Sequence, residues 1–433
     1  MSWIKRRPLL AIAAFAFAAR AACAVVTEFK PIFPAYYYTD ARLANEDALA
    51  GLTAMREGRR PVLSGPIGTR LHQLMTLGPY LVFGPRPIAV KLLNAALGAG
   101  GIAALVAAFA LVFSWPAALA SGIALSLWPS HIFYTSQNLK ESPTHALAFS
   151  GLAAVLALGL RPPAPGAGRA VLAAAAASAL IGAGFFRSYV LLCLSLALFA
   201  GFALEAARRK PRGPAIAALS VAALSAALFP PASRSLYAAL QRPGEDSSIS
   251  PSDAERTRPS LLPNTIVDTN NMVVYRPTSP LGLTEFRHAR QESDRVWASS
   301  KAHREIGTQI FPNVVFRSWT DILSYLPEGA FYVLFMPLPG LYPTDGKIGR
   351  IAASVENLAL LALACFAAVG FIRRPWASGR AALMLYFIAM TTGAALLEFD
   401  LGSAGRHKLL YLPMLFPFAA EEILRLLGTK ETE

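Results

Sequence analysis

Apolar residues fall into long blocks along most of this chain, separated by short polar segments rich in Arg, Pro and Gly. Blocks of about 20 apolar residues cross the ~30 Å hydrocarbon layer of a bilayer as α-helices. Only helices or closed barrels can pair their backbone polar groups there, so the pattern predicts an all-α integral membrane protein. Ten spans are predicted, at about 9–27, 88–113, 117–136, 143–160, 168–186, 189–206, 213–230, 351–372, 381–397 and 408–426.

The orientation follows from the basic residues between these spans. With the N-terminus inside, the inner segments include MSWIKRR, RPPAPGAGR, RRKPRG and FIRRPWASGR, each with clustered Lys or Arg. Such clusters stay in the cytoplasm, and the opposite orientation would place almost all of them outside. We expect a multi-pass protein of the inner (cytoplasmic) membrane, with both termini cytoplasmic and the functional groups facing the periplasm or exterior.

The span pattern also predicts three domains. They are an N-terminal transmembrane module (1–230) with a long first outer loop (28–87), an outer segment (231–350), and C-terminal transmembrane helices (351–433). The apolar stretches 71–83 and 326–343 are too short or too interrupted to cross, and are predicted to be interfacial or re-entrant. Pro337 and Pro339 are expected to break a helix in the second of them.

Composition agrees with a membrane protein. Of 433 residues, 55% are apolar and 15% are charged, and the mean hydropathy is +0.44, whereas soluble proteins carry about 25% charged residues. The net charge of +14 lies largely between the spans, which argues against a nucleic-acid partner. Cys23, Cys193 and Cys365 all lie inside apolar blocks, so neither a disulfide framework nor a metal cluster is predicted.

The outer segments collect ionisable groups around the ends of the helices. The first loop contains YYYTDARLANED, in which Asp40 directly precedes a helical pattern and Asp47 follows two helical turns later. Further along are Glu141, then Arg187 in a tight turn between spans five and six. Before the last span come Arg406, His407 and Lys408, three basic groups that an outer loop does not need for orientation.

This inventory fits a sugar donor linked to a lipid through phosphate. Arg and Lys bind phosphate, so Arg187, Arg406, His407 and Lys408 are the candidate donor-phosphate ligands. An acceptor hydroxyl or amine must lose a proton as it attacks the anomeric carbon, and a nearby carboxylate can take that proton. Asp40 is the first candidate base, with Glu141 second and Asp47 as a second acid. Carboxylates would also suit a divalent cation, although nothing in the sequence requires a cofactor.

Two stretches carry a family resemblance. YYTDARLANEDALAGLTAMREGR with the following RLHQLMTLGPYLVFG, and later LWPSHIFYTSQNLKESP, are similar to the GT-C glycosyltransferases, in particular to bacterial relatives of the dolichyl-phosphate-mannose protein mannosyltransferases. The resemblance covers roughly 10–230 and 350–426. It implies a GT-C-like membrane fold, a polyprenyl-phosphate-linked donor, an outward-facing site and a catalytic base in the first loop, here Asp40.

The chain also departs from that family. Many members have an acidic pair where this sequence has Asp40 followed by Ala41, so either Asp40 acts alone or Asp47 supplies the second carboxylate. Transfer is expected to proceed with inversion, and the acceptor could be a glycan, a lipid or a protein. Two alternatives stay open, namely a polymerase or ligase of lipid-linked polysaccharide and a lipid or solute transporter. A transporter predicts ionisable groups near the midplane and repeated halves, which the sequence does not show.

Overall fold

The computed structural model describes residues 7–63, 65–161, 166–208, 213–240, 265–267, 273–275, 279–291, 308–343, 345–374 and 377–428. The chain divides into two compact units. Unit 1 comprises Met1–Gln241, Ala359–Met390 and Leu409–Glu433, and unit 2 comprises Arg242–Leu358 and Thr391–Lys408. Most of the predicted polar stretch 241–310 lies outside the described residues, as does the start of the first basic segment.

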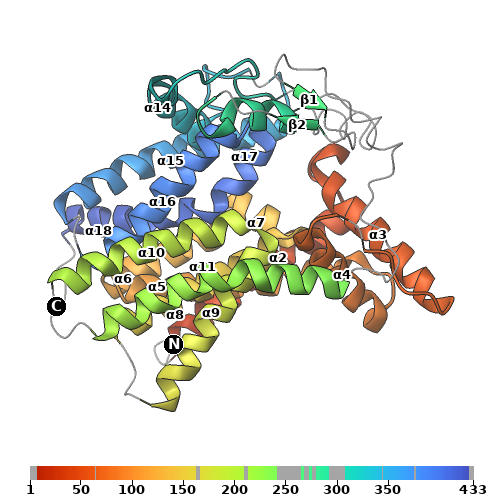
Figure 1. The fold of residues 1–433 in the computed structure, drawn as a ribbon, viewed down its shortest axis with the longest axis horizontal. Helices are drawn as coiled ribbons and strands as arrows, with labels where there is room; N and C mark the ends of the chain where they lie inside the picture. Colours follow the sequence, from red (N-terminus) through yellow and green to blue (C-terminus); the bar gives the residue numbers. More distant parts are fainter. Residues whose placement is uncertain are drawn as a thin grey trace. The chain divides into compact units, whose positions relative to one another are not determined.

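Unit 1 is a helical bundle with α5 and α8 at its centre (Figure 1). The helix α5 packs against α2 and α8, α8 packs against α9, and α10 packs against α11. The bounds are α2 (Pro8–Phe29), η1 (Ala35–Tyr38), α3 (Thr39–Arg56), α4 (Ile67–Phe83), α5 (Pro87–Ala110), α6 (Trp115–Leu127), α7 (Pro129–Ser136), α8 (Glu141–Leu160), α9 (Ala167–Phe186), α10 (Ser188–Arg208), α11 (Gly213–Leu240), η4 (Leu412–Leu415) and α18 (Phe416–Leu426), with parts of α15 (Ile348–Arg373) and α16 (Ser378–Leu397).

Glycine permits close packing in this bundle. A Cβ at Gly101 of α5 would lie 3.3 Å from the backbone nitrogen of Ala146 on α8. Small residues at such positions let helix backbones approach within van der Waals contact, which is the main source of helix association in a bilayer. The alanine- and glycine-rich spans therefore pack closely at the centre of unit 1, and the loops of unit 1 connect these helices.

Two predicted spans are wrong as continuous helices, and proline explains both. The stretch 117–136 is divided into α6 and α7 at Trp128, whose extended ψ of 116° is the conformation favoured before Pro129. The stretch 408–426 becomes η3 (Lys408–Leu410), η4 and the 11-residue α18, with Pro413 and Pro417 at the starts of the last two. By contrast, the tight turn predicted between spans five and six is confirmed, because α9 ends at Phe186 and α10 begins at Ser188.

Among the described residues, seven helices are long and apolar enough to cross a membrane, namely α2, α5, α8, α9, most of α11, α15 and most of α16. The helix α6 is apolar but falls short of that length, and so does the apolar part of α10, Ser188–Leu204. These helices indicate a multi-pass membrane protein that is nearly all helical. The cysteines Cys23, Cys193 and Cys365 are free thiols, in agreement with the sequence.

Unit 2 contains a short antiparallel pair, β1 (Thr265–Val267) and β2 (Val273–Tyr275), followed by η2 (Pro280–Gly282), a helix at 283–291, α14 (Trp319–Phe335), the start of α15, the end of α16 and α17 (Leu401–His407). The helix α14 begins with a capping box between Ser318 and Asp321 and ends just before Pro337, as predicted. Its inner face packs Phe316, Ile322 and Tyr325 into one apolar cluster.

Candidate active site

Asp40 lies in the first turn of α3, and its side chain is exposed. The turn before it is anchored by aromatic packing, since the Tyr38 and Phe33 rings both meet Phe133 edge to face, with centroids 5.7 and 5.0 Å away. Tyr38 occupies the N-cap, and Asp40 is the second residue of the helix. The N-terminal end of a helix favours a negatively charged side chain, and Asp40 lies there with its side chain exposed.

Glu141 and Arg187 form a buried ion pair at the same end of unit 1. Glu141 is the first residue of α8, and Arg187 is the extended residue that joins α9 to α10. The Arg187 Nη2 lies 2.5 Å from Glu141 Oε1, with the two side chains 9% and 1% exposed, and Nη1 donates to the Tyr189 hydroxyl at 3.1 Å. Two predicted site residues from different loops are thus brought together. Each charge of this buried pair compensates the other, because burying either charge alone would cost several kcal/mol of free energy.

One polar face of α4 makes hydrogen bonds to α3 and to the loop that precedes α8. Gln73 donates from Nε2 to Asp47 Oδ2 at 2.9 Å, and the Tyr80 hydroxyl donates to Asn45 Oδ1 at 3.1 Å. Thr76 donates to Asn138 Oδ1 at 3.1 Å, in the loop that leads into Glu141. The α4 face therefore connects α3, which carries Asp40, to the start of α8. It also gives Asp47 an amide partner on α4 while its side chain stays exposed.

The start of α4 meets the end of α9 at backbone contact. A Cβ at Gly68 would lie 2.7 Å from the Phe186 carbonyl oxygen and 2.9 Å from that of Phe185. No side chain fits there without moving one of the two backbones. Gly68 thus lets the start of α4 approach Phe186, the residue next to Arg187.

His72 lies where these segments meet. The imidazole is buried, 8% exposed, and burial lowers its pKa to about 4, so the ring is neutral at neutral pH. The charges of Glu141, Lys140 and Asp40 all act on it. His72 therefore shares one electrostatic environment with both candidate bases.

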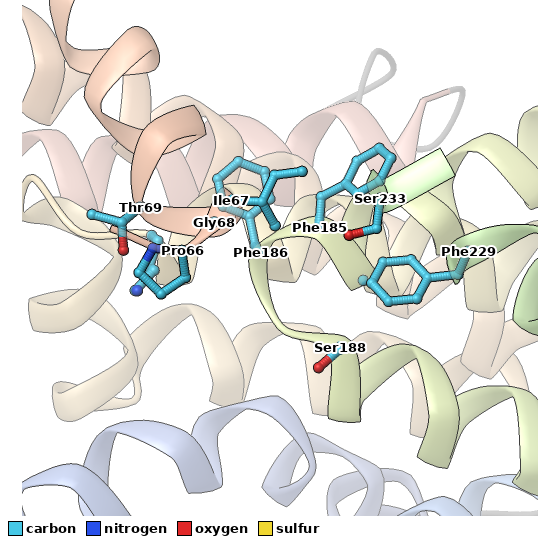
Figure 2. A pocket seen from close by; sticks show the side chains of 11 residues that line it. Pro66, Ile67, Gly68, Thr69, Phe185, Phe186, Ser188, Phe229 and Ser233 are labelled. Atoms are coloured by element: carbon cyan, nitrogen blue, oxygen red, sulfur yellow. The ribbon is translucent and has the colours of Figure 1, made fainter. Parts of the chain in front are cut away.

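A pocket of about 290 Å³ opens beside the ion pair. Figure 2 shows Pro66 and Thr69 at the start of α4 on one side, Phe229 and Ser233 of α11 on the other, and Ser188 at the start of α10. The pocket is also lined by Lys140, Gly184, Phe185 and Phe186. Its lining therefore includes Phe186 and Ser188, the two neighbours of Arg187. Its walls combine aromatic rings, hydroxyl groups and one ammonium, which suits a ligand with an apolar part and an anionic head.

The buried side chain of Arg20 has hydrogen-bond partners within the protein. Its Nε donates to the Thr135 hydroxyl at 2.8 Å, Nη1 donates to the Ala16 carbonyl at 3.0 Å, and Nη2 lies 2.8 Å from His131 Nδ1. The guanidinium is fully buried. These contacts offset the cost of a charge inside a membrane-spanning helix, and they tie α2 to α7.

The last predicted cations lie in unit 2 and make internal contacts. His407 Nδ1 is 2.5 Å from Glu398 Oε1, and both side chains are buried. Lys408 is 4% exposed, and its Nζ donates to Asn357 Oδ1 at 2.5 Å and to the Leu334 carbonyl at 3.1 Å. Arg406 is half-buried on α17. Nothing in the structure tests whether these residues bind phosphate, so that role stays a prediction.

Several residues of the Asp40 region were missed by sequence reasoning. Gln73, Thr76 and Tyr80 recur at helical spacing along α4 within a stretch that was noted for its apolar character. That polar stripe, together with the Gln137–Asn138 pair before α8, was the signal available in the sequence. No group of three or more His, Cys, Asp or Glu side chains is arranged to hold a metal ion within the described ranges.

Comparisons of the chain with known proteins give a likeness in fold. No protein-family model matches the sequence, and no curated protein matches it either. The structure resembles that of the archaeal oligosaccharyltransferase AglB from Archaeoglobus fulgidus in complex with an inhibitory peptide and a dolichol-phosphate, with a TM-score of 0.51 and 13% identity over 98% of this chain. A crystal structure of the Archaeoglobus fulgidus oligosaccharyltransferase tethered to an acceptor peptide gives a TM-score of 0.49 and 13% identity over 98% of this chain.

The chain spans about half the length of those solved proteins, 51% and 50% respectively. At this level of identity the likeness concerns the fold alone. It supports the expected membrane fold built almost entirely of helices. The closer resemblance to bacterial relatives of the protein mannosyltransferases stays a prediction.

Proposed function

We propose that this protein is a GT-C-type glycosyltransferase, which moves a sugar from a polyprenyl-phosphate-linked donor to an acceptor on the outer face of the membrane. One observation carries the proposal: the charges of Asp40 and Glu141 act on the same buried imidazole of His72, and the ion pair of Glu141 with Arg187 adjoins an amphipathic pocket. An ionised carboxylate next to a pocket with a cationic rim is what transfer from a phosphate-linked sugar requires.

The proposed reaction uses Asp40 as the base. The Asp40 carboxylate removes a proton from the acceptor hydroxyl or amine while that atom attacks the anomeric carbon. The bond between the anomeric carbon and the phosphate oxygen breaks, and its electron pair leaves on the polyprenyl phosphate. Attack from the side opposite the phosphate inverts the anomeric centre. Asp40 suits this role because its side chain is exposed, whereas the Glu141 carboxylate is held by Arg187.

The donor phosphate is assigned to the pocket. Lys140 on its wall would supply a point charge, and the hydroxyls of Thr69 and Ser188 would donate hydrogen bonds. Arg187 stabilises the leaving group from the adjoining turn, and Glu141 fixes its guanidinium in place. The rings of Phe185 and Phe229 offer an apolar wall for the first isoprene units of the lipid.

The test is transfer from radiolabelled polyprenyl-phosphate sugars by the reconstituted protein, with acceptor supplied by membranes from a host that lacks the gene. Asp40→Asn is expected to lower transfer by about 10²- to 10⁴-fold while donor binding survives. Glu46→Gln is the matched control, because Glu46 lies on the same helix, is exposed and pairs only across the helix surface with Arg42 at 3.1 Å. It should leave transfer unchanged.

Other outcomes would redirect the assignment. Full transfer by Asp40→Asn would move the base to Glu141 or Asp47. A product that grows by repeating units would favour the polysaccharide polymerase, and lipid or solute movement without any transfer would favour the transporter. Addition of a chelator to the same assay tests for a divalent cation.

A further inference from the structure

The helix α4 has its polar and apolar sides reversed. Its polar residues Gln73, Thr76 and Tyr80 are buried, and they bond to α3 and to the loop before α8. Leu71 and Val82 lie on the opposite side of the helix, the first half-buried and the second exposed. A surface helix of a water-soluble protein turns its apolar side to the core and its polar side to water. The arrangement of α4 is the opposite, so its outward side is suited to an apolar medium.

The exposed apolar residues of α4 are concentrated at its C-terminal end. Leu81, Val82 and Phe83 are 51%, 74% and 62% exposed, and we call these three residues the α4 tip. Three successive large apolar side chains are costly to leave in water, and an apolar patch of this kind marks an interaction surface. The identity of the partner follows from where the α4 tip lies in the fold.

The chain places the α4 tip beside a helix that is long and apolar enough to span a membrane. The helix α4 ends at Phe83, and α5 begins at Pro87, so the Cα atoms of these two residues are at most ~14 Å apart. The buried side of α4 packs on the first turn of α5, because Tyr80 and Val90 belong to one apolar cluster. The α4 tip is therefore held close to the end of α5.

The end of a second such helix lies at the same place. Glu28, the last residue but one of α2, pairs with Lys91 of α5, with 2.8 Å between Glu28 Oε2 and Lys91 Nζ. Phe29 follows Glu28 and is 83% exposed. Exposed apolar side chains thus lie where α2 ends and where α5 begins. They continue the apolar surface of two helices that are suited to lipid.

We infer that the α4 tip inserts among the lipid acyl chains at this boundary, so that α4 lies in the membrane interface with its apolar side toward the bilayer. A lipid partner is favoured over a protein because the adjoining surfaces belong to α2 and α5. Arg86, which is exposed just after the α4 tip, complements the phosphate of the lipid headgroups.

This contact does not depend on the proposed reaction, but it has a consequence for the candidate site. The buried side of the same helix bonds to α3, which carries Asp40, and to the loop that leads to Glu141. Lipid contact on one side of α4 would hold these residues at the membrane boundary, which is where the phosphate of a lipid-linked donor lies.

The test is the depth of a nitroxide spin label at Val82→Cys in liposomes of phosphatidylethanolamine and phosphatidylglycerol. The native cysteines are first replaced (Cys23→Ala, Cys193→Ala and Cys365→Ala). Collisions with oxygen, which concentrates in acyl chains, are compared with collisions with a water-soluble nickel chelate. The label should lie about 5–10 Å below the headgroups, with oxygen collisions dominant. Glu46→Cys is the control, because Glu46 is exposed on α3 and pairs with Arg42, so its label should meet the nickel chelate.

Two results would overturn the inference. A label at position 82 that meets the nickel chelate as often as the label at position 46 would place the α4 tip in water. Protection from both reagents would mean that protein covers it, either a second copy or another segment of the chain. If the cysteine-free variant does not fold, a benzophenone amino acid at position 82 of the otherwise wild-type protein gives the same decision. It should cross-link to radiolabelled phospholipid, and its failure to do so would count against the inference. Sugar transfer is measured separately, so neither result bears on the proposed function.

Discussion

The two groups of predicted cations have different environments. In unit 1, Lys140 lines a pocket, and so do Phe186 and Ser188, the two neighbours of Arg187 in the chain. In unit 2, the Lys408 ammonium is buried against an amide oxygen and a carbonyl, and His407 is paired with Glu398. The sequence shows the same residue types in both places. The difference is whether the charged residue borders a pocket, and that depends on the fold.

A buried charge whose partners are internal stabilises the protein mainly through those partners, whereas a charge beside a pocket is available to a ligand. Glu141 and Arg187 combine both conditions, since the pair is buried but adjoins the pocket. The variants below separate the two, from the largest expected effect to the smallest.

The largest effect on stability is expected from Arg187→Gln. It would leave the Glu141 carboxylate buried without its cation, and breaking a buried pair in this way costs about 3–5 kcal/mol. The double variant Glu141→Gln with Arg187→Gln should lose less than the sum of the single variants, because no uncompensated charge remains. Unfolding by denaturant in detergent measures all three.

The matched control for this pair is Arg42→Gln, which breaks an exposed ion pair with Glu46 on the surface of α3. Exposed pairs contribute about 0.2–1 kcal/mol, so the two arginines should differ severalfold. An Arg187→Gln variant as stable as Arg42→Gln would contradict the burial of the ion pair.

An intermediate effect is expected from Lys408→Met. The substitution keeps the side-chain length but leaves Asn357 Oδ1 and the Leu334 carbonyl without their donor, which costs about 1–3 kcal/mol. The donor KM should stay near the wild-type value, because the ammonium is used inside the protein. A rise in donor KM without a loss of stability would instead support the prediction that Lys408 binds phosphate.

Lys140→Met makes the corresponding test for a cation in unit 1. Its ammonium is at the pocket wall, so we expect a donor KM raised by about tenfold, equivalent to about 1.4 kcal/mol of binding, with little change in stability. If the two lysine variants behaved alike, the contrast between the two groups of cations would fail.

Much of the fold could be predicted from the sequence because the membrane imposes a simple length rule. The turn at Arg187 and the helix end before Pro337 were predicted from span length and proline and are confirmed. The break at Trp128 was missed although Pro129 signals it, because the apolar pattern continues across it. Periodicity records burial and cannot tell a broken helix from a continuous one.

The candidate site could be predicted only in part. Charges outside the spans drew attention to Asp40, Glu141 and Arg187, but the pairing of the last two joins residues 46 positions apart, and no local pattern encodes it. His72 was missed for a different reason. A single histidine in an apolar stretch has no signal of its own, and its surroundings come from other segments, among them the loop that contains Asn138.

A further effect concerns the approach of α4 to α9, and it tests whether α4 sets the geometry of the site. Gly68→Ala introduces a Cβ 2.7 Å from the Phe186 carbonyl, and neither backbone can yield easily, so overpacking should cost about 1–2 kcal/mol. Gly78→Ala is the control on the same helix, because a Cβ there meets nothing within 4 Å. That control should be neutral or stabilising by up to ~1 kcal/mol, since alanine favours a helix over glycine.

Transfer kinetics of the same two variants then decide what α4 does. If α4 holds Asp40, His72 and Arg187 at fixed distances, Gly68→Ala should lower kcat more than its loss of stability explains, since a shift of 1 Å in positioning can cost about 10²-fold. Gly78→Ala should keep the wild-type kcat. Equal kcat in both variants, with Gly68→Ala folded but less stable, would mean that the contact with Phe186 supports the bundle and not the site.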